Sequence, residues 1–110
     1  MDTTPREVRN YITRDGREPY EEWVNTLDIK ARAIIRERIN RLHLGNFGDY
    51  RSLKGGVYEL RIHYGSGYRV YVAVLTKVFV LIIFGGPKDT QVRDIKKAKI
   101  LLEEFKVRNI

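Results

Sequence analysis

Two short segments of the chain carry most of the residues that could act on a phosphate group. The first segment contains Arg61 and His63, and the second contains Arg69 and Tyr71. An arginine guanidinium binds phosphate oxygens in pairs, a histidine transfers protons near neutral pH, and a tyrosine ring stacks on a base. This combination of side chains predicts a binding site for a nucleic-acid phosphodiester.

The pattern of these two segments predicts a β-hairpin. Val57–Tyr64 and Tyr68–Leu75 alternate in polarity and are joined by Gly65-Ser66-Gly67. A three-residue loop would pair Tyr64 with Tyr68 and sort the side chains into two faces, whereas a two-residue loop would mix them. The apolar face would then consist of Tyr58, Leu60, Ile62, Val70, Val72 and Val74.

The opposite face of this hairpin is the candidate site. In the three-residue-loop register, His63 is opposite Arg69 and Arg61 is opposite Tyr71, with Cβ atoms about 5 Å apart. Two guanidiniums at this spacing repel each other unless an anion lies between them, and Glu59 on the same face could supply part of that neutralisation. A solvated sheet face with an Arg–Glu pair is the alternative to a phosphate site. Side chains on this face are expected to contribute little to the core.

The segments before the hairpin predict a strand and two helices. Glu7–Thr13 alternates in polarity as a strand does. Pro19 suits the first turn of a helix, and Asp28 suits the N-cap of a second helix that ends near Gly45. The arginines of that second helix are expected on its solvated surface; they are Arg32, Arg36, Arg38 and Arg41.

The rest of the chain predicts strands and one final helix. A short strand is possible at Tyr50–Leu53, and Val78–Phe84 is a third hairpin-linked strand. Gly85–Asp89 is expected to break the sheet, and Thr90–Val107 has helical periodicity. The order β-α-α-β-β-β-α predicts an α+β fold with an antiparallel or mixed sheet.

Length and charge limit the possible functions. The 110 residues suit one domain spanning positions 1–110. The absence of cysteine excludes disulfides and thiol chemistry. A net charge of +7 favours polyanionic partners such as nucleic acid. Charge alone does not separate RNA from DNA or from an acidic protein, and a basic protein with no such partner is the alternative.

Several other classes of site lack a sequence signal. The polar start Met1–Glu7 has no signal-peptide core, and the apolar run Val78–Phe84 is too short to span a bilayer. We therefore expect a cytoplasmic protein without membrane contact. His43 and His63 have no metal-ligand spacing, and Gly85-Gly86 lacks a nucleotide-binding pattern, so no metal or cofactor is expected.

Three motifs in order resemble one family of proteins. They are LKGGVYELRI at 53–62, GYRVYV at 67–72 and GGPKDTQVRDIKKA at 85–98. Together they resemble the RelE/HigB-type addiction-module toxins, in particular the phage-derived HigB-like killer proteins. The resemblance implies a RelE-like microbial-RNase fold, with helices packed on a curved, mainly antiparallel sheet. It also implies a metal-independent endoribonuclease that cleaves messenger RNA in the ribosome, and a cognate antitoxin, commonly of the helix-turn-helix type.

The resemblance assigns roles to particular residues. Arg69 corresponds to the arginine of the family's GYR motif and is the first candidate for phosphate stabilisation. Arg61 and Lys88 correspond to other basic positions of the catalytic site. Lys54 and Tyr71 are candidates for contacts with the RNA backbone and a base.

The chain departs from well-known members of that family near the start of the last helix. Gln91, Arg93 and Asp94 stand where some relatives carry tyrosine or histidine, so the proton-transfer groups are in doubt. His63 is the candidate substitute. Gln91 and Arg93 join the RNA-contacting candidates, and Gln91 and Asp94 either orient the arginines or cap the helix.

The expected mechanism needs no protein nucleophile. In metal-free cleavage the 2′-hydroxyl of RNA attacks the phosphate, while the protein transfers protons and stabilises developing charge. Two alternatives keep the same charge and fold without this chemistry. One is a non-catalytic RNA- or DNA-binding module, and the other is a decayed toxin that retains only antitoxin binding.

Overall fold

A computed structural model describes residues 4–108 of the chain. Met1–Thr3, the first part of the polar start, lie outside the described residues. The sheet is open and has five strands in the order β1-β5-β4-β3-β2. β1 runs parallel to β5 and the other neighbours are antiparallel, so the predicted α+β class with a mixed, mainly antiparallel sheet is confirmed. The strands are β1 (Glu7–Asn10), β2 (Tyr50–Ser52), β3 (Val57–Ile62), β4 (Tyr68–Val74) and β5 (Phe79–Pro87).

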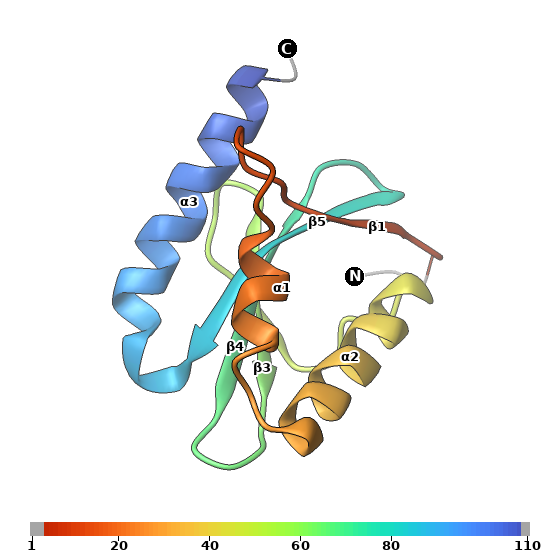
Figure 1. The fold of residues 1–110 in the computed structure, drawn as a ribbon. Coiled ribbons are helices and arrows are strands. Elements are labelled where there is room, and N and C mark those ends of the chain that lie inside the picture. The colour runs from red at the N-terminus through yellow and green to blue at the C-terminus, as the bar shows by residue number, and fades with distance from the viewer. Residues whose placement is uncertain (1–3, 109–110) are drawn as a thin grey trace.

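The helices form layers on the two faces of the sheet. They are α1 (Pro19–Val24), α2 (Ile29–His43) and α3 (Gln91–Arg108), with a 3₁₀ turn η1 (Lys88–Thr90) before α3. In Figure 1, α1 lies in front of the sheet, α2 lies to the right and α3 runs along the left side. Buried residues of α1 and α2 pack on one face with Leu60 and Val70, whereas α3 packs on the other face with Tyr71 and Ala73. The central strands β3, β4 and β5 therefore lie between two layers of buried side chains, whereas the edge strands β1 and β2 keep exposed residues.

Local sequence signals set the ends of the helices as predicted. Pro19 occupies the first turn of α1. The Asp28 side chain caps α2 by accepting a hydrogen bond from the Ala31 N–H. Gly45 follows α2 with a positive φ of 86°, a conformation that favours glycine.

Arg38 of α2 contradicts the expectation of a solvated arginine surface. Its side chain is buried and donates hydrogen bonds to the backbone carbonyl oxygens of Phe47, Asp49 and Arg61. Burial is the main cause that lowers the pKa of Arg38, followed by the nearby charge of Arg41. These hydrogen bonds therefore connect α2 to the loop before β2 and to the end of β3.

The hairpin of β3 and β4 has the predicted faces but a different register. Ile62 pairs with Tyr68, and Leu60 pairs with Val70. The loop therefore has five residues, and within it the Gly67 N–H donates to the Tyr64 carbonyl. Successive side chains of a strand point to alternate faces of the sheet. A shift of two residues in the pairing of β3 with β4 therefore leaves the composition of each face unchanged and alters only which residues are opposite each other.

The predicted break at Gly85–Asp89 is wrong for its first three residues. Gly85, Gly86 and Pro87 continue β5 and pair with β4. The register between these strands shifts by one residue near Tyr71, so Ile83 and Phe84 both pack on the side of α3. A β-bulge of this kind lets the strand continue while it redirects the following side chains.

The two glycines permit close packing rather than a chain break. A Cβ atom at Gly85 would lie closer than 3.0 Å to the Trp23 ring of α1. A Cβ atom at Gly86 would lie equally close to the carboxylate of Asp94 in α3. Real Cβ atoms essentially never show such separations, so this part of β5 requires residues without side chains.

Within residues 4–108, no helix is both long enough and apolar enough to cross a membrane.

Candidate phosphate-binding site on the sheet

The candidate site is organised around the buried carboxylate of Glu59 in β3. The Glu59 side chain has no exposed surface. Its Oε1 lies 2.7 Å from Arg69 Nε and 3.7 Å from Arg61 Nε. Its Oε2 lies 3.4 Å from a terminal nitrogen of Arg51. The Gln91 amide of α3 donates to both oxygens, at 2.8 and 2.9 Å.

The strand register explains why these residues meet. Arg61 is directly opposite Arg69, and Arg51 of β2 is directly opposite Glu59. Like charges on opposite positions of a sheet destabilise it. The anion expected between the arginines is therefore present within the chain, and it is Glu59.

The three arginines differ in their access to solvent. The exposed fraction of the side chain is 9% for Arg69, 32% for Arg61 and 50% for Arg51. The Arg69 Nε–H approaches Glu59 as an ion pair without hydrogen-bond alignment. Arg61 and Arg51 thus offer guanidinium nitrogens to an incoming anion, while the Arg69 side chain is mostly buried. The expectation that Arg69 contributes little to the core is wrong.

Tyr71 does not provide an exposed stacking surface, contrary to prediction. The residue has no exposed area, because α3 covers this face of the sheet. Its ring stacks on Phe84 with centroids 6.1 Å apart, and Lys97 lies over the Phe84 ring. Burial, followed by the charges of Glu59 and Asp94, raises the pKa of Tyr71, whose hydroxyl has no hydrogen-bond partner among residues 4–108.

His63 does not lie opposite Arg69 as predicted. It follows the end of β3, its side chain is 71% exposed, and its Nε2 lies 2.5 Å from Oδ2 of Asp49. That hydrogen bond is the main cause that lowers the pKa of Asp49. The prediction failed because the five-residue loop takes His63 out of the paired strand.

The remaining predicted residues lie around the arginines. Lys88 is exposed, and its backbone N–H donates to the Gly67 carbonyl, which holds it beside the hairpin loop. Lys54 is exposed in the β2–β3 loop with a φ of 68°, at the opposite end of β3. Arg93 is exposed on α3 and lies 3.7 Å from the Asp94 carboxylate. The structure thus joins Arg61, Arg69 and Gln91, with Lys88 at the same end of the sheet.

One residue near the site, Arg51, was missed from the sequence, whereas Asp94 was named as a residue that either orients the arginines or caps the last helix. Arg51 lies in a segment recognised only as a possible short strand, and its position opposite Glu59 follows from the register. Asp94 is buried over Gly86, which pairs with Arg69, and it accepts a hydrogen bond from the Thr90 hydroxyl. The adjacent glycines were the available signal, since Gly86 leaves the space that Asp94 fills.

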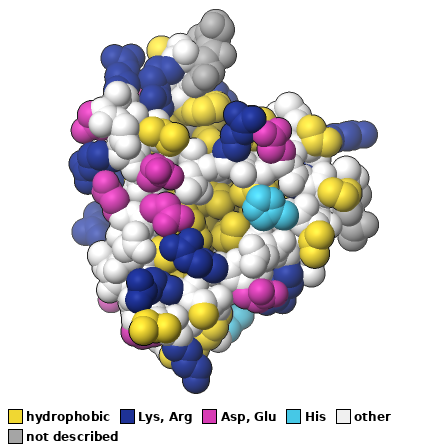
Figure 2. Space-filling model, turned by 45° about the vertical axis from the view of Figure 1, so that its right-hand side comes forward, with side chains coloured by type: hydrophobic (Ala, Val, Ile, Leu, Met, Phe, Trp, Pro, Cys, Tyr) yellow, Lys and Arg dark blue, Asp and Glu magenta, His cyan; other side chains and the backbone are white. Residues whose placement is uncertain are grey.

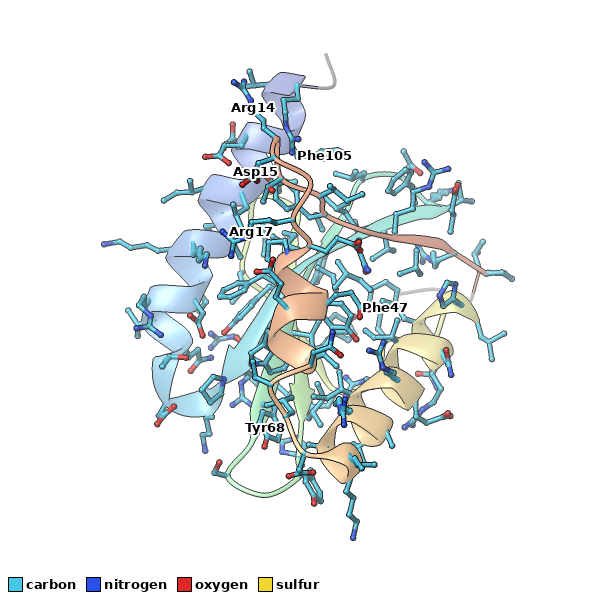
Figure 3. The ribbon with its side chains drawn as sticks, in the orientation of Figure 1. Arg14, Asp15, Arg17, Phe47, Tyr68 and Phe105 are labelled. Carbon is cyan, nitrogen blue, oxygen red and sulfur yellow. The ribbon has the colours of Figure 1, made fainter. Side chains whose placement is uncertain are left out.

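Cavities lie both beside this cluster and away from it. One of about 490 Å³, at the start of α3, is lined by Asp89, Arg93 and Lys96. Another of about 760 Å³ is lined by Arg14, Asp15 and the outer side of α3. In Figure 3 these two residues lie at the top of the molecule, whereas Tyr68, next to Arg69, lies near the bottom. Nucleic-acid backbones bind open basic surfaces, so a deep cavity is not required at a phosphate site.

A third hollow lies between β1, α1 and α2. It has a volume of about 250 Å³ and contains none of the predicted site residues. Figure 2 shows its hydrophobic floor with charged side chains and a histidine around the rim. Across residues 4–108, no group of three or more histidine, aspartate or glutamate side chains is placed to hold a metal ion.

Comparison with known proteins identifies a relative of the chain. No family model matches the sequence. A protein of Haemophilus influenzae (strain ATCC 51907 / DSM 11121 / KW20 / Rd), described only as uncharacterized, is 46% identical over 87 residues. The match covers 78% of this chain and 88% of that protein.

Proposed function

We propose that this chain, which belongs to the same family as that uncharacterized Haemophilus influenzae protein, is a toxin that cleaves messenger RNA without a metal ion. The single observation that carries the proposal is the convergence of Arg51, Arg61 and Arg69 on one buried carboxylate. The α+β order, with helices on both faces of a mainly antiparallel sheet, supports a RelE-like version of the fold.

The charge of the cluster suits a phosphodiester that undergoes cleavage. Three guanidiniums and the Glu59 carboxylate leave a net charge of +2 at a site where Arg51 and Arg61 are partly exposed. The phosphate gains negative charge when the RNA 2′-hydroxyl attacks it, and fixed positive groups stabilise that transition state more than the ground state. Arg61 and Arg51 would contact the phosphate oxygens, and Lys88 would contact the backbone beside the hairpin loop.

The general acid and base lie outside this arginine cluster. Guanidiniums remain protonated, so they stabilise charge and do not exchange protons with RNA. His63 lies at the hairpin loop, where the Asp49 carboxylate orients its ring. In this proposal His63 reaches RNA from the loop side, beside Asp49, rather than from beside Arg69.

Cleavage of a defined messenger RNA tests the function. Purified protein is incubated with the RNA, with and without translating ribosomes, and the fragment ends are identified. The expected products carry a 2′,3′-cyclic or 3′-phosphate and a 5′-hydroxyl, and substitution of the scissile 2′-hydroxyl by hydrogen blocks the reaction. Excess chelator should leave ribosome-free cleavage unchanged. Cleavage of the 2′-deoxy substrate would contradict the mechanism.

One observation favours a non-catalytic alternative. Glu59 already neutralises part of the arginine charge, as in a purely structural ion-pair network. A module that only binds RNA or DNA would retain salt-dependent affinity without producing fragments. The same incubation separates the two functions, because binding without cleavage on and off the ribosome supports the alternative.

The proposed toxin has a cognate antitoxin of complementary charge. A surface with a net charge of +7 attracts an acidic or amphipathic segment. The complex should therefore weaken as salt rises, which isothermal titration can measure. An affinity that stays constant from low to high salt would show that apolar contacts dominate.

A further inference from the structure

We infer that Glu59 and Gln91 are positioning residues that hold Arg51, Arg61 and Arg69 in one arrangement before RNA binds. The inference rests on the proposed function and extends it to two residues that do not themselves contact the substrate. Glu59 has no exposed surface, so RNA cannot reach its carboxylate. The carboxylate nevertheless lies within 4 Å of all three guanidiniums.

The arginines would separate without this carboxylate. Arg61 and Arg69 occupy opposite positions on adjacent strands, where two positive charges repel each other. Arg61 and Arg51 are partly exposed and are free to turn toward water. Glu59 keeps their guanidiniums directed at one point, so the ordering free energy is supplied during folding rather than during the reaction.

Gln91 holds Glu59 in place from the other layer of the molecule. Its amide nitrogen donates to both carboxylate oxygens, whereas the amide oxygen would be repelled by them, so the orientation of the amide is determined. Gln91 is the first residue of α3 and follows η1, which carries Lys88. The contact therefore ties the basic end of β5 and α3 to the arginine cluster on β3 and β4.

A neutral donor suits this position better than a charged one. A lysine or arginine at position 91 would compete with Arg61 and Arg51 for the carboxylate. Glutamine satisfies the buried oxygens without changing the net charge of +2 that faces the substrate. Hydrogen bonds to a buried carboxylate are strong. Removal of the Gln91 amide would therefore leave the Glu59 oxygens with only the arginines as hydrogen-bond donors.

The test compares Glu59→Gln and Gln91→Leu with the wild-type protein. Both changes keep the approximate side-chain size. Glu21→Gln is the matched control, since it removes another Arg–Glu pair, with Arg36 at 3.1 Å, on the α1 and α2 side of the sheet. For each protein we would measure single-turnover cleavage, affinity for the 2′-deoxy substrate analogue, and the melting temperature.

The expected result is a loss of rate without a loss of affinity. Glu59→Gln should lower cleavage by about tenfold to a hundredfold, the size expected for displaced catalytic groups. Its affinity for the analogue should stay the same or increase, because the protein gains one net positive charge. Gln91→Leu should lower the rate less, and Glu21→Gln should cleave at the wild-type rate. Wild-type rates in folded Glu59→Gln and Gln91→Leu, or equal losses of rate and affinity, would overturn the inference.

A spectroscopic measurement separates this inference from the proposed function. The Nε–H signal of Arg69 in ¹⁵N-labelled protein should be a single sharp line in the wild type, where Glu59 holds one arrangement of the side chain, and should broaden or divide in Glu59→Gln. A wild-type protein that does not cleave RNA would refute the proposed function alone. An Arg69 signal that is unchanged in Glu59→Gln would refute the positioning role, whether or not the protein cleaves RNA. If Glu59→Gln fails to fold, the Arg69 signal of Gln91→Leu is compared with that of the wild type, and an unchanged signal would refute the positioning role.

Discussion

Arg69 Nε lies 2.7 Å from Oε1 of Glu59, and this carboxylate has no contact with solvent. This pair links the stability of the protein to the proposed chemistry. Arg69 corresponds to the arginine of the GYR motif, and it also neutralises the buried Glu59 carboxylate. Substitutions in this cluster must therefore be interpreted with folding and activity measured together.

Arg69→Ala is expected to impair folding as well as cleavage. The change leaves a buried carboxylate with only Gln91 and the more distant arginines, and breaking a buried ion pair costs about 3 kcal/mol or more. A chain of this size has a total stability of roughly 5–15 kcal/mol. Urea denaturation should show the loss. Arg69→Lys is the control that keeps the positive charge. An Arg69→Ala variant as stable as the wild type would contradict the burial of the Arg69–Glu59 ion pair.

Arg61→Ala and Arg51→Ala are the better tests of phosphate contact, because both side chains are partly exposed. Each should lower single-turnover cleavage by about 10²-fold, as for loss of one fixed donor to developing charge. Stability should change little in comparison with Arg69→Ala. Arg9→Ala is the matched control, since Arg9 is an exposed arginine on β1 that pairs with Glu7. Equal effects of Arg9→Ala and Arg61→Ala would show that only overall charge matters.

Gly86→Ala and Gly85→Ala should destabilise the protein through steric overlap. The new methyl groups would meet Asp94 and Trp23, respectively. Overpacking of this kind costs about 1–3 kcal/mol, and chemical denaturation measures it. Gly16→Ala gives the comparison, because position 16 has a φ of 83° but open space. Its expected loss of stability, about 1–2 kcal/mol, comes from the backbone conformation alone. Gly86→Ala should also disturb Arg69, which pairs with Gly86.

Stability should fall in alkaline solution as buried tyrosines lose their protons. Burial raises the pKa of Tyr20 to about 12 and also raises that of Tyr71, whereas a tyrosine in an unfolded chain titrates near pH 10. The stabilising contribution is therefore complete below about pH 10 and is lost as the pH rises toward 12.

Phenolate absorbance measures this titration in a chain with seven tyrosines. Tyr20 and Tyr71 should ionise only as the protein unfolds, and Tyr20→Phe and Tyr71→Phe identify their signals. Tyr71→Phe should keep or slightly raise stability, because the hydroxyl is buried with no partner among residues 4–108. Ionisation of every tyrosine near pH 10 in folded protein would contradict the burial of both rings.

The sequence by itself determined the features that depend on near neighbours along the chain. Pro19 and Asp28 predicted the starts of two helices because capping involves only the adjacent turn. The alternation in β3 and β4 predicted which side chains share a face, since that depends on parity alone. The anion between the arginines was also visible, because Glu59 lies two residues from Arg61 on the same face.

Only the tertiary structure decided the partners across strands and layers. A shift of two residues in the hairpin preserves both faces, so parity did not show that Arg61, rather than His63, lies opposite Arg69. The covering of this face by α3, which buries Tyr71 and brings Gln91 to Glu59, depends on contacts between residues far apart in sequence. Such contacts form because the whole chain must bury apolar surface on both sides of one sheet, and no single segment specifies that arrangement.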